Sequence, residues 1–332
     1  MISPNRGYDT GANMHLNISK KKTAYPSTSS PRGYSLNVIC RFILVYISVL
    51  LFQKKNSIIV FQKIRTNRIY AAALKLLLYL RPENTIYDID DPDYLTFNKK
   101  TINHFIQNAE KCTVGSAALY DYASKLNPNS FLLTSPVIYH NETRNNTNTI
   151  FTIGWIGYYN AHRNSLKELL FPALSNHNFD IRLVLLGVSN SKDILEIQAM
   201  FANSPNITLD IPIGINWLDE MSVYKRICTF DIGVSPLLNT DVNQAKSAFK
   251  LKQCLSCGVP VLASPVGENN SFIKNGVNGY FCIDSSEFRM KIITMKELHV
   301  NAYNDMAKNA LETTNEFNMN LYTNNLTGLF YR

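Results

Sequence analysis

Short apolar runs alternate along this chain with longer stretches in which apolar residues recur every three or four positions. The short runs predict buried strands at 57–62, 84–89, 111–116 and 131–137, and then at 150–157, 181–187, 207–211 and 230–236. The longer stretches between them predict helices. Because strands and helices alternate, we expect an α/β fold built from βαβ units, with parallel sheets and right-handed crossovers.

Composition divides the chain into a series of parts. Residues 1–35 are polar and are predicted to be a disordered lead-in, and residues 36–139 form a first α/β domain with only three or four strands. The Asn-rich stretch 140–149 has the composition of a linker. Residues 150–310 are predicted to form a second α/β domain, and residues 311–332 a closing helix that returns toward the first.

One apolar stretch near the N-terminus does not fit a buried strand. It runs from Phe42 to Phe52, which is shorter than the roughly 20 residues that span a bilayer, and Arg41 precedes it. A signal peptide is disfavoured because the stretch begins late and no small-residue cleavage pattern follows it. Two interpretations remain open: a buried helix packed on the strand that follows, and a helix that lies on a membrane surface.

Charge and cysteine content narrow the classes of function. The 332 residues include 45% hydrophobic and 17% charged residues, as in a globular chain, and carry a formal net charge of +8. That charge suits an anionic substrate and an anionic membrane, whereas no basic helix or aromatic-interleaved motif indicates nucleic-acid binding. Among the six cysteines, Cys254 and Cys257 have the spacing of a metal pair, but no second pair completes a zinc site. We therefore expect core thiols in a reducing compartment.

The most informative segment is FDIGVSPLLNTDVNQAKSAFKLKQCLSCGVPVLASPVGENNSFIKNGVNGYFC, residues 230–282. Its pattern predicts a strand, a polar loop, a helix that carries Lys246, Lys250 and Gln253, and a second strand that ends before Gly267. Such a unit places the loop and the helix start at the carboxyl edge of a parallel sheet, where α/β proteins bind ligands. Two lysines four positions apart, together with the amides of the helix start, favour an anion such as a diphosphate.

The same segment resembles the donor-binding part of retaining, nucleotide-sugar-dependent glycosyltransferases with two Rossmann-like domains (the GT-B architecture, group 1 or family 4). The similarity is greatest to a bacterial polysaccharide-biosynthesis branch, whose K-x-x-F-K-L helix and G-[LV]-P-V-[VL]-A-S-P-V-G run match residues 246–251 and 258–267. It extends back through NWLDEMSVYKRICTFDIGVSP and GWIGYYNAHRN to IYDIDDPDYL, and covers residues 57–290. Relatives have six or seven βα repeats in the first domain, so the resemblance implies that this first domain is incomplete.

The resemblance assigns residues to the donor's phosphates and ribose. It implies that Lys250 contacts the β-phosphate and that Lys246 is a second diphosphate contact. Gln253 stands where most relatives carry a glutamate that accepts hydrogen bonds from ribose hydroxyls, and an amide oxygen can still accept one such bond. The first acid of the family's Glu-x7-Glu pair has no clear counterpart, and Asp241 is its substitute in the same loop.

Further donor contacts are expected at the ends of two strands of the second domain. The run GWIG at 154–157 ends the first of them, where glycine lets the backbone approach a pyrophosphate. Many relatives carry an arginine two residues later, and here Arg163 is the stand-in. The residues expected to contact the donor at these two turns are Gly154, Gly157, Tyr158, Arg163, Gly267, Glu268 and Asn269.

An acidic cluster, YDIDD at 87–91, ends a strand of the first domain. Alternation along the strand sends Asp88 and Asp90 to one face. Relatives place a His or Asp here, so the resemblance implies that Asp90 positions the acceptor hydroxyl or takes its proton. Such a cluster also suits Mn²⁺, but this architecture neutralises the leaving diphosphate with lysines and helix dipoles, so no metal or other cofactor is expected.

The resemblance thus implies a retaining glycosyltransferase that moves a sugar from a nucleotide-diphosphate donor to a lipid-linked or polysaccharide acceptor. It further implies a role in capsule or lipopolysaccharide synthesis, in the cytoplasm at the inner face of the plasma membrane. No protein nucleophile is expected, because retention in this family follows front-face attack. Two alternatives stay open: a truncated, catalytically impaired subunit that binds nucleotide sugar, and a sugar-nucleotide 2-epimerase.

Overall fold

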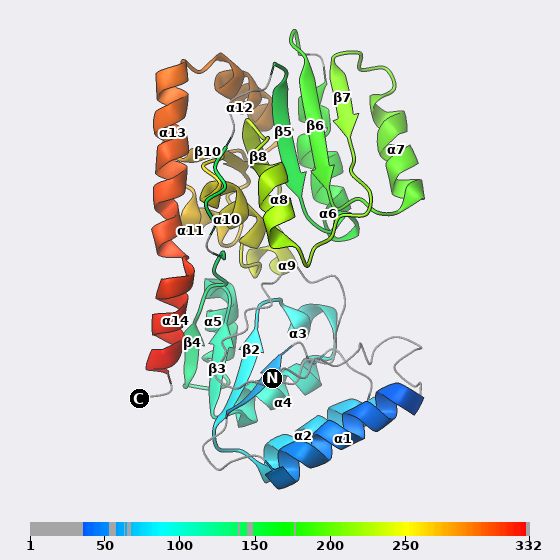
Figure 1. The fold of residues 1–332 in the computed structure, drawn as a ribbon, viewed down its shortest axis with the longest axis vertical. Helices are drawn as coiled ribbons and strands as arrows, with labels where there is room; N and C mark the ends of the chain where they lie inside the picture. Colours follow the sequence, from blue (N-terminus) through cyan, green and yellow to red (C-terminus); the bar gives the residue numbers. More distant parts are fainter. Residues whose placement is uncertain are drawn as a thin grey trace. The chain divides into compact units, whose positions relative to one another are not determined.

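The chain folds into two compact units (Figure 1). The computed structural model describes residues 36–52, 58–62, 64, 68–138, 140–144, 149–175 and 177–329. The first unit takes in Met1–Ser135 and the short segment Gln244–Ser247, and the second takes in Pro136–Asn243 and Ala248–Arg332. The lead-in predicted at 1–35 and part of the linker predicted at 140–149 lie outside the described residues.

The first unit contains a four-stranded parallel sheet with the order β1-β2-β3-β4. Its strands are β1 (Ile59–Gln62), β2 (Thr85–Ile89), β3 (Lys111–Val114) and β4 (Ser130–Leu132). Its helices are α1 (Leu36–Phe52), α2 (Arg68–Leu80), α3 (Asp93–Thr96), α4 (Lys99–Asn108) and α5 (Ala117–Ala123). The strands predicted for the first half are confirmed, because each apolar run pairs with the next in sequence order.

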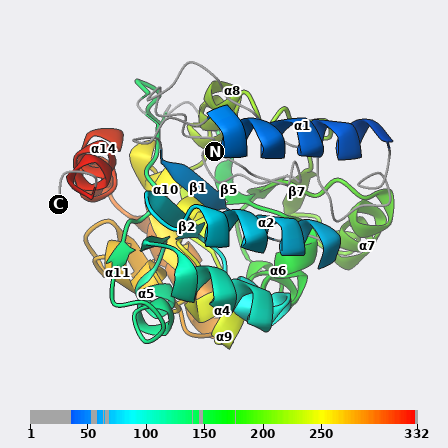
Figure 2. The same ribbon diagram turned by 90° about the horizontal axis from the view of Figure 1, so that it is seen from below.

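The core of the first unit lies between this sheet and its helices. Helix α2 contributes Leu74, Leu77 and Leu78, whose spacing of three and four puts them on one face of the helix. Opposite them lie strand residues such as Phe61 and Tyr87, which are almost fully buried. Figure 2 shows α1, α2 and α4 running alongside one another.

The second unit contains a six-stranded parallel sheet with the order β10-β9-β8-β5-β6-β7. Its strands are β5 (Phe151–Ile156), β6 (Ile181–Leu186), β7 (Ile207–Asp210), β8 (Ile232–Ser235), β9 (Val261–Ala263) and β10 (Gly279–Phe281). The helices of its first half are α6 (Tyr159–Ser165), the π-helix η2 (Leu166–Leu170), the 3-10 helix η3 (Pro172–Leu174), α7 (Ser191–Phe201), α8 (Glu220–Ile227) and α9 (Asp241–Gln244). Those that follow are α10 (Phe249–Ser256), α11 (Asn269–Phe272), α12 (Ser285–Glu297), α13 (Val300–Thr313), the 3-10 helix η4 (Thr314–Glu316) and α14 (Met319–Gly328).

Apolar side chains cover both faces of this second sheet. In β6, Leu183 and Leu185 belong to one core cluster, whereas Val184 and Leu186 belong to another. Successive side chains of a strand point to opposite faces, so a strand buried on both faces is apolar at every position. This explains why the strands of the second unit are continuous apolar runs.

The helix predicted to carry Lys246, Lys250 and Gln253 begins later in the structure than expected, so the prediction is wrong for its start. Helix α10 begins only at Phe249, and Ala248 before it has a left-handed backbone with a φ of 51°. Lys246 precedes the helix, in the segment that belongs to the first unit. Lys246 and Lys250 therefore do not share a helix face.

The apolar stretch at 42–52 forms most of helix α1, and the buried-helix interpretation is wrong for one of its faces. Phe42, Tyr46, Val49 and Leu50 pack against the core of the first unit. The opposite side of the helix is exposed and is also apolar. None of the helices in the described ranges is long and apolar enough to cross a membrane.

The expectation of core thiols is confirmed for five of the six cysteines. Only Cys40 is exposed, and all six thiols are free. Cys254 packs tightly against β8, where a Cβ on Gly233 would lie 2.7 Å from its sulfur. Burial raises the pKa of Cys254 to about 12, so this thiol stays protonated and serves as a small apolar side chain.

Candidate functional site

The strand order of the second unit defines a switch point between β5 and β8. From β5 the chain adds β6 and β7 on one side, and it later adds β8, β9 and β10 on the other. The loops that leave the carboxyl ends of β5 and β8 therefore diverge. In open parallel sheets this divergence opens a crevice at the carboxyl edge, where ligands bind.

Two glycines form the floor of this edge. Gly157 follows β5 with a φ of 156°, and Gly187 follows β6 with a φ of 115°, conformations that favour glycine. The two turns are tied together, since the amide of Gly157 donates to the carbonyl of Leu186 (2.8 Å) and the amide of Tyr159 donates to that of Gly187 (3.3 Å). A Cβ on Gly187 would collide with the carbonyl oxygen of Gly157. Both turns thus need glycine for their close approach.

Lys250 lies directly over the Gly157 turn. A Cβ on Gly157 would be 2.5 Å from its Nζ, which shows how closely the ammonium group approaches the turn. The same Nζ lies 2.6 Å from Nε2 of His162 on α6 and 5.8 Å from the centre of the Trp155 ring. As the lysine donates, His162 accepts through an unprotonated Nε2. The structure therefore brings the predicted Lys250 and Gly157 together, with a histidine that holds the lysine.

Two helix starts add to the positive potential of this edge. Helix α6 begins after Tyr158 and helix α10 after Ala248, and neither start is capped by a side chain of a described residue. The first amides of a helix carry a partial positive charge, which favours an anion placed before them. Together with Lys250, they make the site suitable for a diphosphate.

A set of buried polar groups lies between α8 and α10. Within the described part of the chain, Oε1 of Gln253 and one carboxylate oxygen of Glu220 are buried without a hydrogen-bond partner, and the Tyr224 hydroxyl lies beside the Gln253 side chain. Burial raises the pKa of Glu220, and burial together with Glu220 raises that of Tyr224. Gln253 lies on the same face of α10 as Lys250, three residues on. Unpaired buried acceptors are costly, so they point to a ligand or to water.

Trp217 extends this site toward the Gly187 turn. It precedes α8 and is partly buried against the same core cluster as α10. A Cβ on Gly187 would lie 3.4 Å from Cζ2 of the indole. An aromatic ring beside a glycine turn offers a flat apolar surface.

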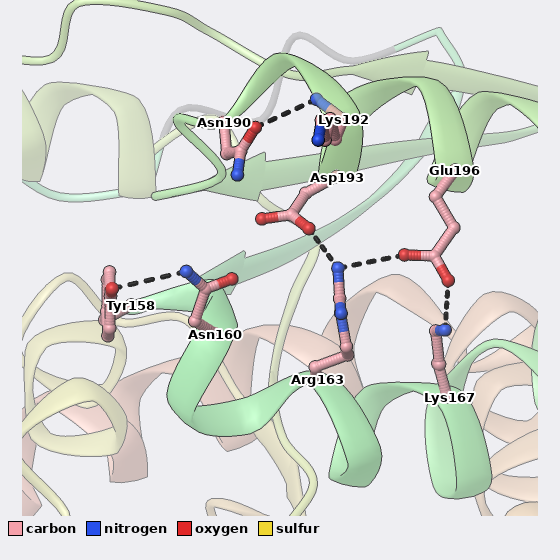
Figure 3. Close-up of polar contacts among 8 residues, drawn as sticks. All are labelled: Tyr158, Asn160, Arg163, Lys167, Asn190, Lys192, Asp193 and Glu196. Carbon is pink, nitrogen blue, oxygen red and sulfur yellow. Dashed lines mark hydrogen bonds and ion pairs between the residues drawn. The ribbon is translucent and has the colours of Figure 1, made fainter.

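Arg163, predicted to stand in for a phosphate-binding arginine, pairs with carboxylates of α7 (Figure 3). Its Nη2 donates to Asp193 and lies 3.0 Å from Oε2 of Glu196, which also accepts from Lys167. Nearby, the hydroxyl of Tyr158 accepts a hydrogen bond of 3.2 Å from Asn160. This network joins α6 to α7, so Arg163 would have to leave two carboxylates to reach a phosphate.

The other predicted donor contacts have structural partners. Gly154 lies within β5, where a Cβ would overlap the ring of Phe230. The side-chain amide of Asn269 donates to the carbonyl oxygens of Ser264 (3.0 Å) and Ser235 (3.3 Å), and so ties the ends of β8 and β9 together.

Three further predicted residues lie around these strand ends. Gly267 has a φ of 56°, Glu268 is buried, and Asp241 is exposed at the start of α9. A ligand contact through Gly267 would have to use the backbone.

The first unit has its own polar group at the carboxyl edge of its sheet. Asp90 follows β2 beside Gly115, where a Cβ would lie 3.3 Å from the Cα of Asp90. Asp88 is held within the strands by Gln62 (2.7 Å) and Thr113 (2.6 Å). Lys246 belongs to this unit too, and burial lowers its pKa against the opposing effect of Asp91. The acidic strand end and Lys246 thus form one group.

Sequence reasoning missed His162 and Gly187. The signal for Gly187 was present, because it ends a predicted strand that neighbours β5. His162 had no comparable signal, since its contact with Lys250 joins positions 88 residues apart.

Comparisons with known proteins identify relatives of the second unit and of the fold. Residues 147–297 match the family model described as glycosyl transferases group 1. The structure of Anabaena Alr3699/HepE in complex with UDP and glucose has a TM-score of 0.67 and 12% identity, over 92% of this chain and 84% of that one. Sucrose-phosphate synthase from Thermosynechococcus elongatus has a TM-score of 0.66 and 12% identity, over 91% and 79%. A glycosyltransferase from Rickettsia africae ESF-5 has a TM-score of 0.62 and 14% identity, over 92% and 84%. Among curated proteins, no sequence match was found.

Two parallel sheets flanked by helices, one with a candidate anion site at its switch point, define an α/β protein of the GT-B architecture. Residues 147–297, nearly all of which lie in the second unit, match the group 1 glycosyltransferase family model, and this match supports a transferase. The predicted fold class and the resemblance to this family are thereby confirmed.

Proposed function

We propose that this glycosyltransferase takes a nucleotide-diphosphate sugar as donor and transfers the sugar, with retention, to a lipid-linked or polysaccharide acceptor in cell-surface glycan synthesis. The proposal includes peripheral association with an anionic membrane at the inner face of the plasma membrane. The observation that carries the donor assignment is Lys250, whose ammonium lies over the Gly157 turn at the switch point of the second sheet. Alr3699/HepE, which has this fold, was solved with UDP and with UDP-glucose, so UDP is the first nucleotide to test.

The proposed chemistry places positive charge where negative charge develops. As the bond between the sugar and the diphosphate breaks, charge builds on the leaving oxygen. Lys250 and the starts of α6 and α10 are positioned to stabilise that charge without a bound metal. His162 holds the lysine by accepting its hydrogen bond.

Gln253 is assigned to the ribose of the donor. Its Oε1 is buried and has no partner among the described residues, so a ribose hydroxyl would supply the missing donor. On the acceptor side we assign Asp90, which follows β2 at the carboxyl edge of the first unit's sheet. It would orient the attacking hydroxyl or accept its proton.

Calorimetric titration with UDP and GDP tests the donor assignment. We expect wild type to bind one nucleotide and Lys250→Ala to bind it about ten- to a hundredfold more weakly, because a charge-assisted hydrogen bond contributes about 1.5–3 kcal/mol. Lys308→Ala is the matched control, since its ammonium is exposed on α13 and its affinity should equal that of wild type. Failure of wild type to bind any nucleotide would favour a subunit without donor binding.

A second variant distinguishes the contribution of the ribose to donor binding from that of the phosphates. Gln253→Met keeps the side-chain length but removes the acceptor. We expect it to weaken UDP binding by about five- to tenfold, the value of one hydrogen bond, and to leave binding of inorganic diphosphate unchanged. Equal loss for both ligands would contradict the ribose assignment.

A further inference from the structure

Helices α1 and α2 of the first unit lie side by side and run in the same direction. In the first half of each helix, the rings of Phe42 and Tyr70 meet edge to face with centroids 4.6 Å apart. At their ends, Arg81 donates from Nη2 to the carbonyl oxygen of Leu50 over 2.9 Å. Figure 2 shows the same arrangement, with α1 and α2 alongside one another.

Each of these helices has two apolar faces. The inner faces pack against the core of the first unit, α1 with Phe42, Tyr46, Val49 and Leu50, and α2 with Leu74, Leu77 and Leu78. The outer faces carry eight further apolar side chains, which are between 43% and 81% exposed. They are Ile43, Leu44, Ile47 and Leu51 of α1 and Ile69, Leu76, Tyr79 and Leu80 of α2. We call these eight residues the α1–α2 outer face.

The spacing of these residues makes them a continuous surface. Ile43, Ile47 and Leu51 recur every four positions, as do Leu76 and Leu80, so each set lies along one side of its helix. Because both helices turn their inner faces to the same core, both outer faces point away from it. A water-exposed helix normally presents polar residues on that side, and contiguous exposed apolar surface marks an interaction site.

Charge decides which partner fits. Residues 36–82 contain eight Lys and Arg and no Asp or Glu. Arg68 is exposed beside Ile69, and Lys75 and Arg81 are partly exposed on and after α2. Apolar side chains among cations are what an anionic bilayer surface takes up, with the apolar groups in the acyl boundary and the cations at the headgroups. Tyr79, the most exposed of the eight at 81%, has the amphipathic ring that favours this depth.

A second copy of the chain fits the same surface less well. A twofold dimer brings a surface opposite itself, so the cations of residues 36–82 would face cations, and this region has no acid to pair with them. We infer that the α1–α2 outer face docks the protein on an anionic lipid bilayer. This inference specifies the membrane association in the proposed function and does not depend on donor binding, since it uses the first unit alone.

Vesicle co-sedimentation of the full chain tests the inference. The vesicles are pure phosphatidylcholine, or phosphatidylcholine with about 30% phosphatidylglycerol. We expect wild type to partition at least about tenfold more strongly onto the anionic vesicles, since each cation near the surface contributes about a fivefold effect. L44Q/L51Q should partition at least about tenfold more weakly than wild type, because two apolar side chains no longer enter the bilayer.

The matched control makes the same kind of change in the second unit. Leu195 and Ile283 are 65% and 68% exposed there, and L195Q/I283Q should partition like wild type. The variant R68Q/K75Q should lose about tenfold on anionic vesicles and show a weaker dependence on salt.

Three outcomes would overturn the inference. One is equal partition of L44Q/L51Q and L195Q/I283Q. Another is no partition of wild type onto either vesicle. The third is self-association of wild type that L44Q/L51Q abolishes while vesicle binding is absent, which would make the face an interface between copies. A UDP titration and a thermal unfolding curve of each variant show whether it is folded, and they keep failure of the docking surface distinct from failure of the donor site.

Discussion

Replacing Gly157 by alanine tests whether the turn after β5 sets the position of Lys250. With the backbone unchanged, the new Cβ would lie 2.5 Å from Nζ and 2.9 Å from Cε of Lys250, and 2.8 Å from Cζ2 of Trp155. The lysine tip is flexible and can move away, whereas the indole is buried in the core of the second unit. We therefore expect the substitution to displace the ammonium from the turn.

The expected effect of Gly157→Ala has two parts, a loss of folding free energy and a loss of affinity for the donor. An alanine held at this positive φ costs about 1–2 kcal/mol of folding free energy, and crowding of Trp155 adds about 1 kcal/mol or more. Displacement of Lys250 removes a charge-assisted contact of about 1.5–3 kcal/mol from donor binding. This corresponds to a Kd for UDP that is about ten- to a hundredfold higher.

Gly276→Ala is the control that separates backbone strain from crowding. Gly276 has a φ of 79°, and a Cβ there would meet only the ring of Tyr280, at 3.8 Å. Calorimetry with UDP and thermal unfolding should show that Gly276→Ala loses stability but keeps its affinity, whereas Gly157→Ala loses both. The reasoning is refuted if Gly157→Ala binds UDP within about threefold of wild type, or if the two variants lose the same affinity.

Two further predictions concern stability. Burial lowers the pKa of Lys252 to about 7, against the opposing effect of Glu268, so the unfolded chain binds more protons than the folded chain between about pH 7 and 10.5. Over that window the unfolding free energy of wild type relative to Lys252→Met should rise by about 5 kcal/mol, and a flat difference in urea titrations would contradict it. Arg144 forms a buried ion pair with Asp231, so Arg144→Met should lower the free energy of unfolding by about 3 kcal/mol. Lys308→Met, at an exposed pair, should lower it by about 0.5 kcal/mol or less. Equal losses in urea titrations would refute this.

The strands of this protein could be predicted from the sequence because each is a short apolar run with turn residues on both sides. A strand buried on both faces of a parallel sheet is apolar at every position, so the length of the apolar run gives the length of the strand. For this reason β5 and β6 appear at the predicted positions. The resemblance in residues 230–282 likewise led to Lys250, which the structure places over the Gly157 turn at the switch point of the sheet.

The start of α10 could not be predicted, because it depends on a backbone conformation that the residue type does not signal. Ala248 adopts a left-handed φ, which is unfavourable for alanine, and only the tertiary structure holds it there. For this reason the prediction that Lys246 and Lys250 share one helix was wrong. His162 was missed because a contact between α6 and α10 leaves no periodic pattern in the sequence.

The distribution of charge decides what the net charge of +8 means. Residues 1–82 carry 13 Lys and Arg against one acid, whereas residues 83–332 carry 20 Lys and Arg against 24 Asp and Glu. The excess of positive charge therefore lies in residues 1–82, and the remainder of the chain, which includes the whole second unit with its proposed donor site, has no such excess. In the proposed function, donor binding depends on local groups, on Lys250 and on two helix starts, which act at contact distance. The excess of cations lies instead in the part of the sequence that contains α1 and α2. If that face docks on anionic lipid, raising the salt concentration should weaken vesicle binding far more than it weakens UDP binding.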